Sequence, residues 1–185
     1  MTTRCSEMKF VQETQTGRRQ FLRAGVFSGA AALLAPALWP LRTFAAGHTD
    51  VLLLSCMDYR LVGHTRDYMV KEGLGDEKYD YIVLAGASLG AVTKKFPAWN
   101  TTFWDHLGLA IDLHHIHKVM ILDHRDCGAY EKIFGIDFYK FPAKETRIHT
   151  EQLQELRRQI KQKYGKRLLD VELLLMDLKG KVEKI

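Results

Sequence analysis

Four short apolar runs, separated by longer stretches of mixed polarity, organise the chain from residue 51 onward. The runs are nearly continuous in Val, Ile, Leu and Met and lack regular polar alternation, which is typical of strands covered on both faces. They occupy residues 51–55, 79–84, 118–122 and 171–176. We predict a buried strand at each of these four positions.

Three of the intervening stretches have helical periodicity, because apolar residues recur three and four positions apart among polar ones. We predict helices over residues 64–72, 101–115 and 146–164, with Asn100 as the N-cap of the second. The charged side chains of the third are expected to face solvent. The apolar faces comprise Phe103, Trp104, Leu107 and Ile111 in the second helix and Ile148, Leu153, Leu156 and Ile160 in the third.

This alternation of strands and helices predicts an α/β fold. Parallel strands joined by right-handed crossovers place helices on both faces of the sheet, which gives three layers. We expect a mainly parallel sheet of four or five strands, because residues 177–181 can turn the chain and add an antiparallel edge strand. A chain of 185 residues with 46% hydrophobic content has room for one such domain.

The first 46 residues differ from the rest in charge. They hold six basic and two acidic residues, whereas residues 47–185 hold 21 basic and 20 acidic ones. The overall charge of +5 and the pI of about 9.1 therefore arise mainly from this segment. Because the predicted domain is nearly neutral, we exclude a nucleic-acid partner.

The order of residues in the same segment is that of a secretory signal. Residues 18–23 read Arg-Arg-Gln-Phe-Leu-Arg, and a small-residue apolar run follows, ending near residue 46. The pattern resembles the twin-arginine signal, which implies export of the folded chain to the periplasm and cleavage after Ala45 or Ala46. We divide the chain into a signal segment, residues 1–46, and a domain, residues 47–185. An amphipathic arm and an uncleaved anchor are the alternatives.

Three potential metal ligands follow two of the predicted strands. Cys56 comes after the first strand, and His124 and Cys127 come after the third. The carboxyl ends of parallel strands meet at one edge of a sheet, so we expect these side chains to converge. Two thiolates and an imidazole suit zinc, and three protein ligands leave a fourth position for water. Such an ion lowers the pKa of its water towards about 7.

Two polar residues stand just beyond the first of these ligands. Asp58 and Arg60 lie two and four positions after Cys56. An arginine fork can hold a carboxylate so that it accepts a hydrogen bond from the reactive oxygen and orients it. We predict that Asp58 and Arg60 are catalytic; the alternative is an ion pair with a purely structural role.

These residues together resemble the β-class carbonic anhydrases. That family carries Cys-x-Asp-x-Arg after one strand and His-x-x-Cys-Gly after another, and both patterns are present, at residues 56–60 and 124–128. The likeness extends over residues 51–130, including a Gly-containing loop at 84–87. Two separated motifs are together far more specific than either alone.

The resemblance implies a function, a cofactor and an assembly. It implies a zinc lyase that reversibly hydrates carbon dioxide to bicarbonate by a metal-bound hydroxide. One zinc ion per chain and a homodimer or higher homo-oligomer follow from it. Separately, the short, glycine- and proline-containing apolar run of the signal segment predicts no stable membrane span after signal removal. The family's ligands and orienting pair correspond to Cys56, His124, Cys127, Asp58 and Arg60.

The sequence departs from the family pattern beside both motifs. Tyr59 stands where the family usually has serine, and Ala85 and Ala87 stand where it usually has asparagine. Related zinc enzymes on this scaffold hydrolyse carbonyl sulfide or carbon disulfide, which makes such a hydrolase the alternative enzyme. A catalytically silent zinc-binding subunit and a redox protein using Cys56 and Cys127 are the alternatives from other classes.

Five further polar residues are assigned structural roles. His114, His115 and His117 stand at the end of the second predicted helix, just before the third predicted strand. The helix dipole favours histidine there, so a second metal site is not expected. Asp123 and Asp126 flank His124 and are interpreted as loop or capping groups, with Asp126 as an alternative partner of the metal site.

Overall fold

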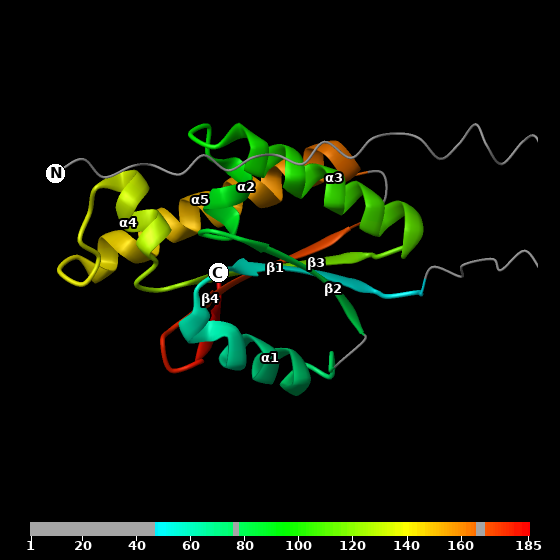
Figure 1. Cartoon of the computed structure of the whole chain (residues 1–185), viewed down its shortest axis with the longest axis horizontal. Helices are drawn as coiled ribbons and strands as arrows, with labels where there is room; N and C mark the ends of the chain where they lie inside the picture. The colour runs from blue at the N-terminus through cyan, green and yellow to red at the C-terminus, as the bar shows by residue number, and fades with distance from the viewer. Residues whose placement is uncertain (1–46, 76–77, 166–168) are drawn as a thin grey trace, which may run out of the picture. The chain divides into compact units, whose positions relative to one another are not determined.

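A five-stranded sheet runs through the part of the chain that this computed structural model describes, residues 47–75, 78–165 and 169–185 (Figure 1). The predicted signal segment lies outside these residues, so its assignment stays a prediction. The strands are β1 (Val51–Cys56), β2 (Tyr79–Leu84), β3 (Lys118–His124), β4 (Asp170–Met176) and β5 (Val182–Lys184).

The sheet has the order β2-β1-β3-β4-β5. The first four strands are mutually parallel, and β5 pairs antiparallel with β4 after the turn predicted at residues 177–181. Strands β1 and β3 are direct neighbours, paired from Val51 with Lys118 to Ser55 with Leu122. Their carboxyl ends therefore lie at the same edge of the sheet, as the predicted site requires.

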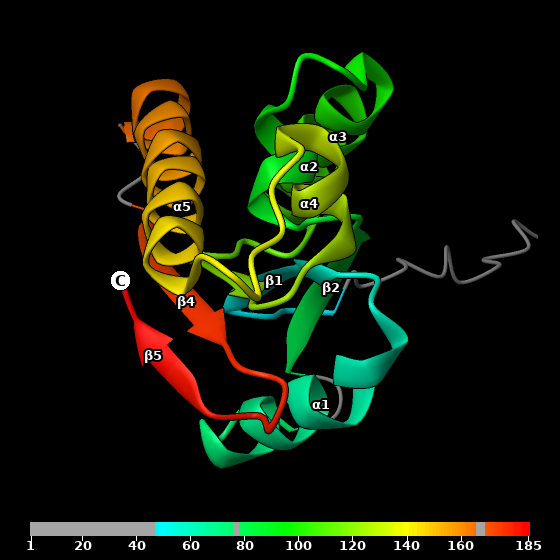
Figure 2. The same cartoon turned by 90° about the vertical axis from the view of Figure 1, so that its left-hand side faces the viewer.

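Helices cover both faces of the sheet, which confirms the three-layer α/β fold (Figures 1 and 2). Helix α1 packs on one face, and α2, α3 and α5 pack on the other. The helical elements are the 3-10 turn η1 (Tyr59–Leu61), α1 (Val62–Lys71), α2 (Ser88–Val92), α3 (Pro97–Leu113), α4 (Gly128–Phe134) and α5 (Pro142–Tyr164).

The continuous apolar runs are explained by burial on both sides. In β1, Leu52 and Leu54 pack against α3 and α5, whereas Val51 and Leu53 pack towards Met69 of α1. All four of these β1 side chains are buried. The predicted apolar faces of α3 and α5 are confirmed as buried or partly buried: all their residues join or pack against the larger core cluster except Ile148, which belongs to a smaller cluster around Tyr130.

Helix boundaries differ from the predictions at the N-terminal ends. Helix α3 begins at Pro97 and α5 at Pro142, because proline at the first helical position has a preset φ and no amide hydrogen to satisfy. Asn100 is thus inside α3, and its side chain donates from Nδ2 to the Gly90 carbonyl at 3.0 Å, so the N-cap prediction was wrong. Helices α2 and α4 were not predicted because they are too short to show a period.

Candidate metal centre

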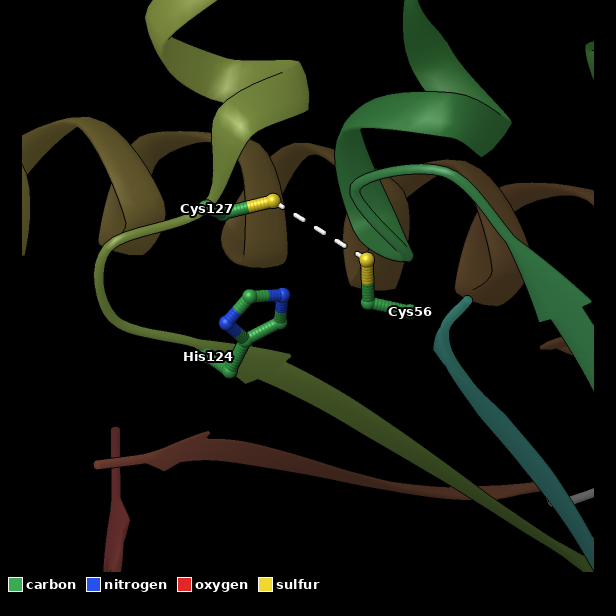
Figure 3. Close-up of side chains that lie close together, drawn as sticks. All are labelled: Cys56, His124 and Cys127. Atoms are coloured by element: carbon green, nitrogen blue, oxygen red, sulfur yellow. Dashed lines mark hydrogen bonds between the residues drawn. The ribbon is translucent and has the colours of Figure 1, made fainter. Parts of the chain in front are cut away.

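The three potential ligands converge at the carboxyl edge of the sheet. Cys56 ends β1, His124 ends β3, and Cys127 directly precedes α4. One candidate ligand atom from each residue lies within 4.8 Å of the other two, and the two Sγ atoms are 3.9 Å apart. The side chains point toward one another from separate elements (Figure 3). The sulfurs are well beyond disulfide bonding distance, and both cysteines are free.

A glycine in the β2–α2 loop holds the Cys56 sulfur in place. The backbone N–H of Gly86 donates to Cys56 Sγ at 3.2 Å. Gly86 has a φ of 76°, and a β-carbon there would lie 3.3 Å from the β-carbons of Ala129 and Leu89. A side chain at this position would thus strain the backbone and crowd the loop, which explains the glycine.

The buried imidazole of His124 has one satisfied and one free nitrogen. Nδ1 donates to the Arg125 carbonyl at 2.8 Å, so Nε2 is the ring nitrogen that remains for a metal ion. Nε2 is buried and lacks a hydrogen-bond partner. An unpaired buried acceptor costs free energy, so its presence beside two sulfurs fits a nitrogen that serves as a metal ligand.

The two thiols have opposite proton affinities. The hydrogen bond from Cys127 lowers the pKa of Cys56 strongly, and His124 lowers it further, although burial opposes both. The hydrogen bond to Cys56 and burial raise the pKa of Cys127. Cys56 is therefore the thiol of the pair that loses its proton more readily. Because the thiolate is the form that binds metals, the electrostatics of the site favour a metal ligand at Cys56.

Asp58 and Arg60 form the predicted pair beside these ligands. Arg60 donates from Nε to Asp58 Oδ1 at 3.0 Å and from Nη2 to Oδ2 at 2.7 Å. These hydrogen bonds lower the pKa of Asp58 to about 2, so the carboxylate is ionised at neutral pH. Asp58 Oδ2 lies 3.9 Å from His124 Nε2. The pair thus stands next to the candidate ligand atoms.

Asp126 completes this pair from the other motif. Arg60 donates from Nη1 to Asp126 Oδ2 at 2.7 Å and from Nη2 to the Asp126 carbonyl at 2.9 Å. Asp126 lies in the loop between β3 and α4, as expected, but the N-cap of α4 is Cys127. The side chain of Asp126 contacts Arg60 instead, next to the candidate ligands. The pair borders an open hollow of about 630 Å³, lined by Met57, Asp58, Tyr59, Arg60, Asp126, Gly128 and Glu131.

The histidines at the end of α3 lie outside the candidate centre. His114 bonds Asp80 through Nδ1 at 2.7 Å, and His117 is 3.5 Å from Asp50. Within the described residues, Cys56, His124 and Cys127 are the one group of His, Cys, Asp or Glu arranged to hold a metal ion.

Sequence reasoning missed a buried polar cluster behind the ligands, defined by Ser88, Asp123, Tyr130 and His149. Asp123 is not a loop residue but the penultimate residue of β3, with a fully buried side chain. It accepts from Ser88 N at 2.9 Å, from Ser88 Oγ at 2.7 Å, from Tyr130 OH at 2.5 Å and from His149 Nδ1 at 2.9 Å. A carboxylate directly after a buried apolar run was the available signal.

Comparison with known proteins gives the class to which the chain belongs. Residues 46–185 match the model of a family described as "Putative carbonic anhydrase". The chain belongs to this family.

The chain is similar in sequence to two proteins of Rickettsia and in fold to a solved structure. A Rickettsia bellii protein described as uncharacterised is 41% identical over 136 residues, which cover 74% of this chain and 81% of the relative. A Rickettsia conorii protein, also described as uncharacterised, is 39% identical over 136 residues, or 74% and 72% of the two chains. The structure of a carbonic anhydrase from Glaciozyma antarctica aligns with 18% identity and a TM-score of 0.47 over 75% of this chain and 82% of that one.

Proposed function

We propose that this protein is a zinc enzyme that reversibly hydrates carbon dioxide to bicarbonate. The observation that carries the proposal is the convergence of Cys56, His124 and Cys127 beside the ionised Asp58 at an open hollow. Membership of the family described as "Putative carbonic anhydrase" supports it.

The residues present fit zinc. Two sulfurs and the free Nε2 of His124 form a donor set that zinc prefers, and three protein donors are typical of a catalytic ion with room for solvent. Zinc, when bound, supplies a water whose pKa is lowered towards about 7. Cys56, His124 and Cys127 are the proposed ligands.

The chain's own residues orient the reacting water. Asp58 is ionised and therefore only accepts hydrogen bonds, so it can hold one water proton and direct the oxygen lone pairs away from itself. Arg60 fixes this carboxylate with two hydrogen bonds, and Asp126 in turn fixes the guanidinium. Carbon dioxide and water yield bicarbonate and one proton, and both products can leave through the open hollow.

The alternative enzyme, a hydrolase of carbonyl sulfide or carbon disulfide, differs from the proposed one in its substrate. Tyr59, which replaces the usual family serine, is 85% exposed at the hollow. Its side chain therefore lies at the solvent side of the hollow that Asp58 also lines. Carbonyl sulfide or carbon disulfide would undergo the analogous attack with release of sulfide, so a sulfide assay separates this hydrolase from the proposed activity.

The decisive experiment measures metal and rate on the full chain isolated from a reducing cytoplasm. We expect about one zinc per chain and carbon dioxide hydration above background in stopped flow. His124→Ala should lose both, whereas the matched variant of the exposed His117, His117→Ala, should retain both. A zinc-loaded protein without hydration activity would contradict the proposal. Sulfide release would favour the hydrolase, and metal-free protein with a Cys56–Cys127 disulfide would favour the redox alternative.

We further propose that residues 1–46 direct twin-arginine export to the periplasm. The Arg-Arg-Gln-Phe-Leu-Arg sequence supports this, as does the benefit of loading thiolate ligands before the chain meets an oxidising compartment. In the portion of the chain described, no helix is long and apolar enough to cross a membrane. Changing Arg18 and Arg19 together to lysine should retain the precursor in the cytoplasm; normal export would contradict the signal.

A homo-oligomer is proposed as the working assembly. Strand β2 lies at the edge of the sheet, and its Tyr81 and Val83 side chains are 46% and 45% exposed. Exposed apolar residues on an edge strand support association with another copy. Light scattering on the purified protein should give at least twice the chain mass; a monomer would contradict this proposal.

A further inference from the structure

Glu145 is a buried carboxylate that contacts the turn between two candidate ligands. It lies in the first turn of α5 and is 5% exposed. Its Oε1 accepts from the backbone N–H of Asp126 at 2.6 Å, and its Oε2 accepts from Nη1 of Arg125 at 3.2 Å. Both of these partners belong to the two-residue turn between His124 and Cys127.

The backbone of this turn adopts a conformation that needs support. Asp126 has a φ of 56°, in the left-handed region that a residue with a β-carbon adopts at a free-energy cost. The hydrogen bond from its N–H to the ionic acceptor on Glu145 favours this conformation. Arg125 is held separately, because its N–H also donates to the Met176 carbonyl and its Nη1 to Thr146.

The conformation of Asp126 determines two features of the candidate metal centre. The turn sets the separation and direction of His124 and Cys127. The carbonyl and the carboxylate of Asp126 also both accept from Arg60, which holds Asp58. A change at Asp126 would therefore move the ligands and the orienting pair together.

We propose that Glu145 is a positioning residue of the metal centre: it fixes the left-handed turn at Asp126, so that the ligands and the Asp58–Arg60 pair keep their relative places. The proposal rests on the proposed function, and it assigns Glu145 no direct contact with metal or substrate. The competing explanation is that Glu145 serves only to neutralise the partly buried Arg125.

Metal affinity provides a readout that does not depend on turnover. Competition with a chromophoric chelator measures zinc affinity, and the visible absorption of the cobalt-substituted protein reports ligand geometry. Glu145→Ala should weaken zinc binding about 10–100-fold and change the cobalt spectrum. Glu151→Ala is the matched control, because Glu151 lies on the same helix with a 60% exposed side chain; it should leave both readouts unchanged.

A conservative variant separates the two explanations. Glu145→Gln keeps an oxygen that can accept from Asp126 N–H but removes one of the two carboxylate charges that Arg125 contacts, leaving that of Glu183. The proposal expects zinc affinity near that of the wild type, whereas a role in neutralising Arg125 alone predicts that the Gln and Ala variants lose affinity alike. This variant also serves if Glu145→Ala does not fold.

A double-mutant cycle tests the backbone argument directly. Glycine adopts positive φ without the cost that aspartate incurs, so Asp126→Gly should make the support from Glu145 less necessary. In the Asp126→Gly protein, Glu145→Ala should lower zinc affinity only about threefold or less. Equal losses in the two backgrounds, or wild-type zinc affinity and cobalt spectrum in Glu145→Ala, would overturn the proposal. Failure of the wild-type protein itself to bind zinc would instead reject the proposed function.

Discussion

Two aspartates beside the candidate ligands illustrate different uses of one side chain. Asp58 stands two residues after Cys56, and Asp123 directly precedes His124. The side chain of Asp58 is 14% exposed at the hollow, whereas that of Asp123 is completely buried. Asp58 bonds the guanidinium of Arg60, a residue on its own short segment. Asp123 bonds residues of three helices, α2, α4 and α5.

The difference lies in which groups remain available to a small molecule. Asp123 accepts hydrogen bonds from Ser88, Tyr130 and His149, so this carboxylate ties the end of β3 to helices α2, α4 and α5. Asp58 faces solvent on one side and can accept from a water. We infer that Asp123 contributes mainly to stability and Asp58 mainly to chemistry, although both adjoin a ligand in the sequence.

The largest effect is expected from removing the buried carboxylate. Asp123→Ala leaves Ser88, Tyr130 and His149 without their shared acceptor, and we expect the free energy of unfolding to fall by about 3–5 kcal/mol. Urea denaturation followed by circular dichroism measures this loss.

A surface aspartate provides the control for this measurement. Asp105→Ala alters an exposed position on α3 and should leave the unfolding curve near that of the wild type. If Asp123→Ala prevents folding, Asp123→Asn, which keeps one acceptor oxygen, gives a milder form of the same test. A buried cluster that tolerates both changes without loss of stability would remove the distinction between the two aspartates.

For Asp58, which is only partly exposed, we expect a loss of activity with little loss of stability. Asp58→Ala should lower kcat/KM for carbon dioxide hydration about 10–100-fold, because the reacting water loses its acceptor. The free energy of unfolding should change by less than about 1 kcal/mol, since the lost ion pair is partly solvated. Stopped flow and urea denaturation on the same samples give the two numbers, and loss of stability with unchanged kcat/KM would reverse our assignment.

The exposed pair was predictable from the sequence, but the buried cluster was not. Local spacing places Asp58 and Arg60 after Cys56, and continuous apolar runs indicate which strands bring Cys56 and His124 to one edge. The partners of Asp123 come from positions 88, 130 and 149, and Glu145 reaches Asp126 from a later helix. Such contacts depend on how α5 packs, which no local pattern encodes.

The contribution of the buried cluster to the free energy of unfolding should depend on pH in the alkaline range. Burial and then the charge of Asp123 raise the pKa of Tyr130 well above its usual value. A raised folded-state pKa gives stability that is complete below the unfolded value of about 10 and is lost as pH rises above it.

Tyr130→Phe isolates this contribution. At neutral pH the variant should be about 1–2 kcal/mol less stable, because it loses the hydroxyl that bonds Asp123 and Ser88. Above pH 10 the gap should close by up to about 1.4 kcal/mol per pH unit, since only the wild-type unfolded state can ionise at this position. Urea denaturation from pH 8 to 11 measures the gap, and a gap that stays constant would contradict the assignment.

The smallest effect is expected from changing the group that holds Asp58. Lysine at position 60 keeps the charge but cannot form the parallel hydrogen bonds to Asp58 while also contacting Asp126. Arg60→Lys should therefore lose about 1 kcal/mol of orientation at this partly exposed site, which corresponds to roughly a fivefold fall in kcat/KM. Zinc content and the urea midpoint should stay at wild-type values, because the buried cluster is untouched. Stopped flow with metal analysis measures both, and a variant that loses its zinc would show that Arg60 supports the ligands themselves.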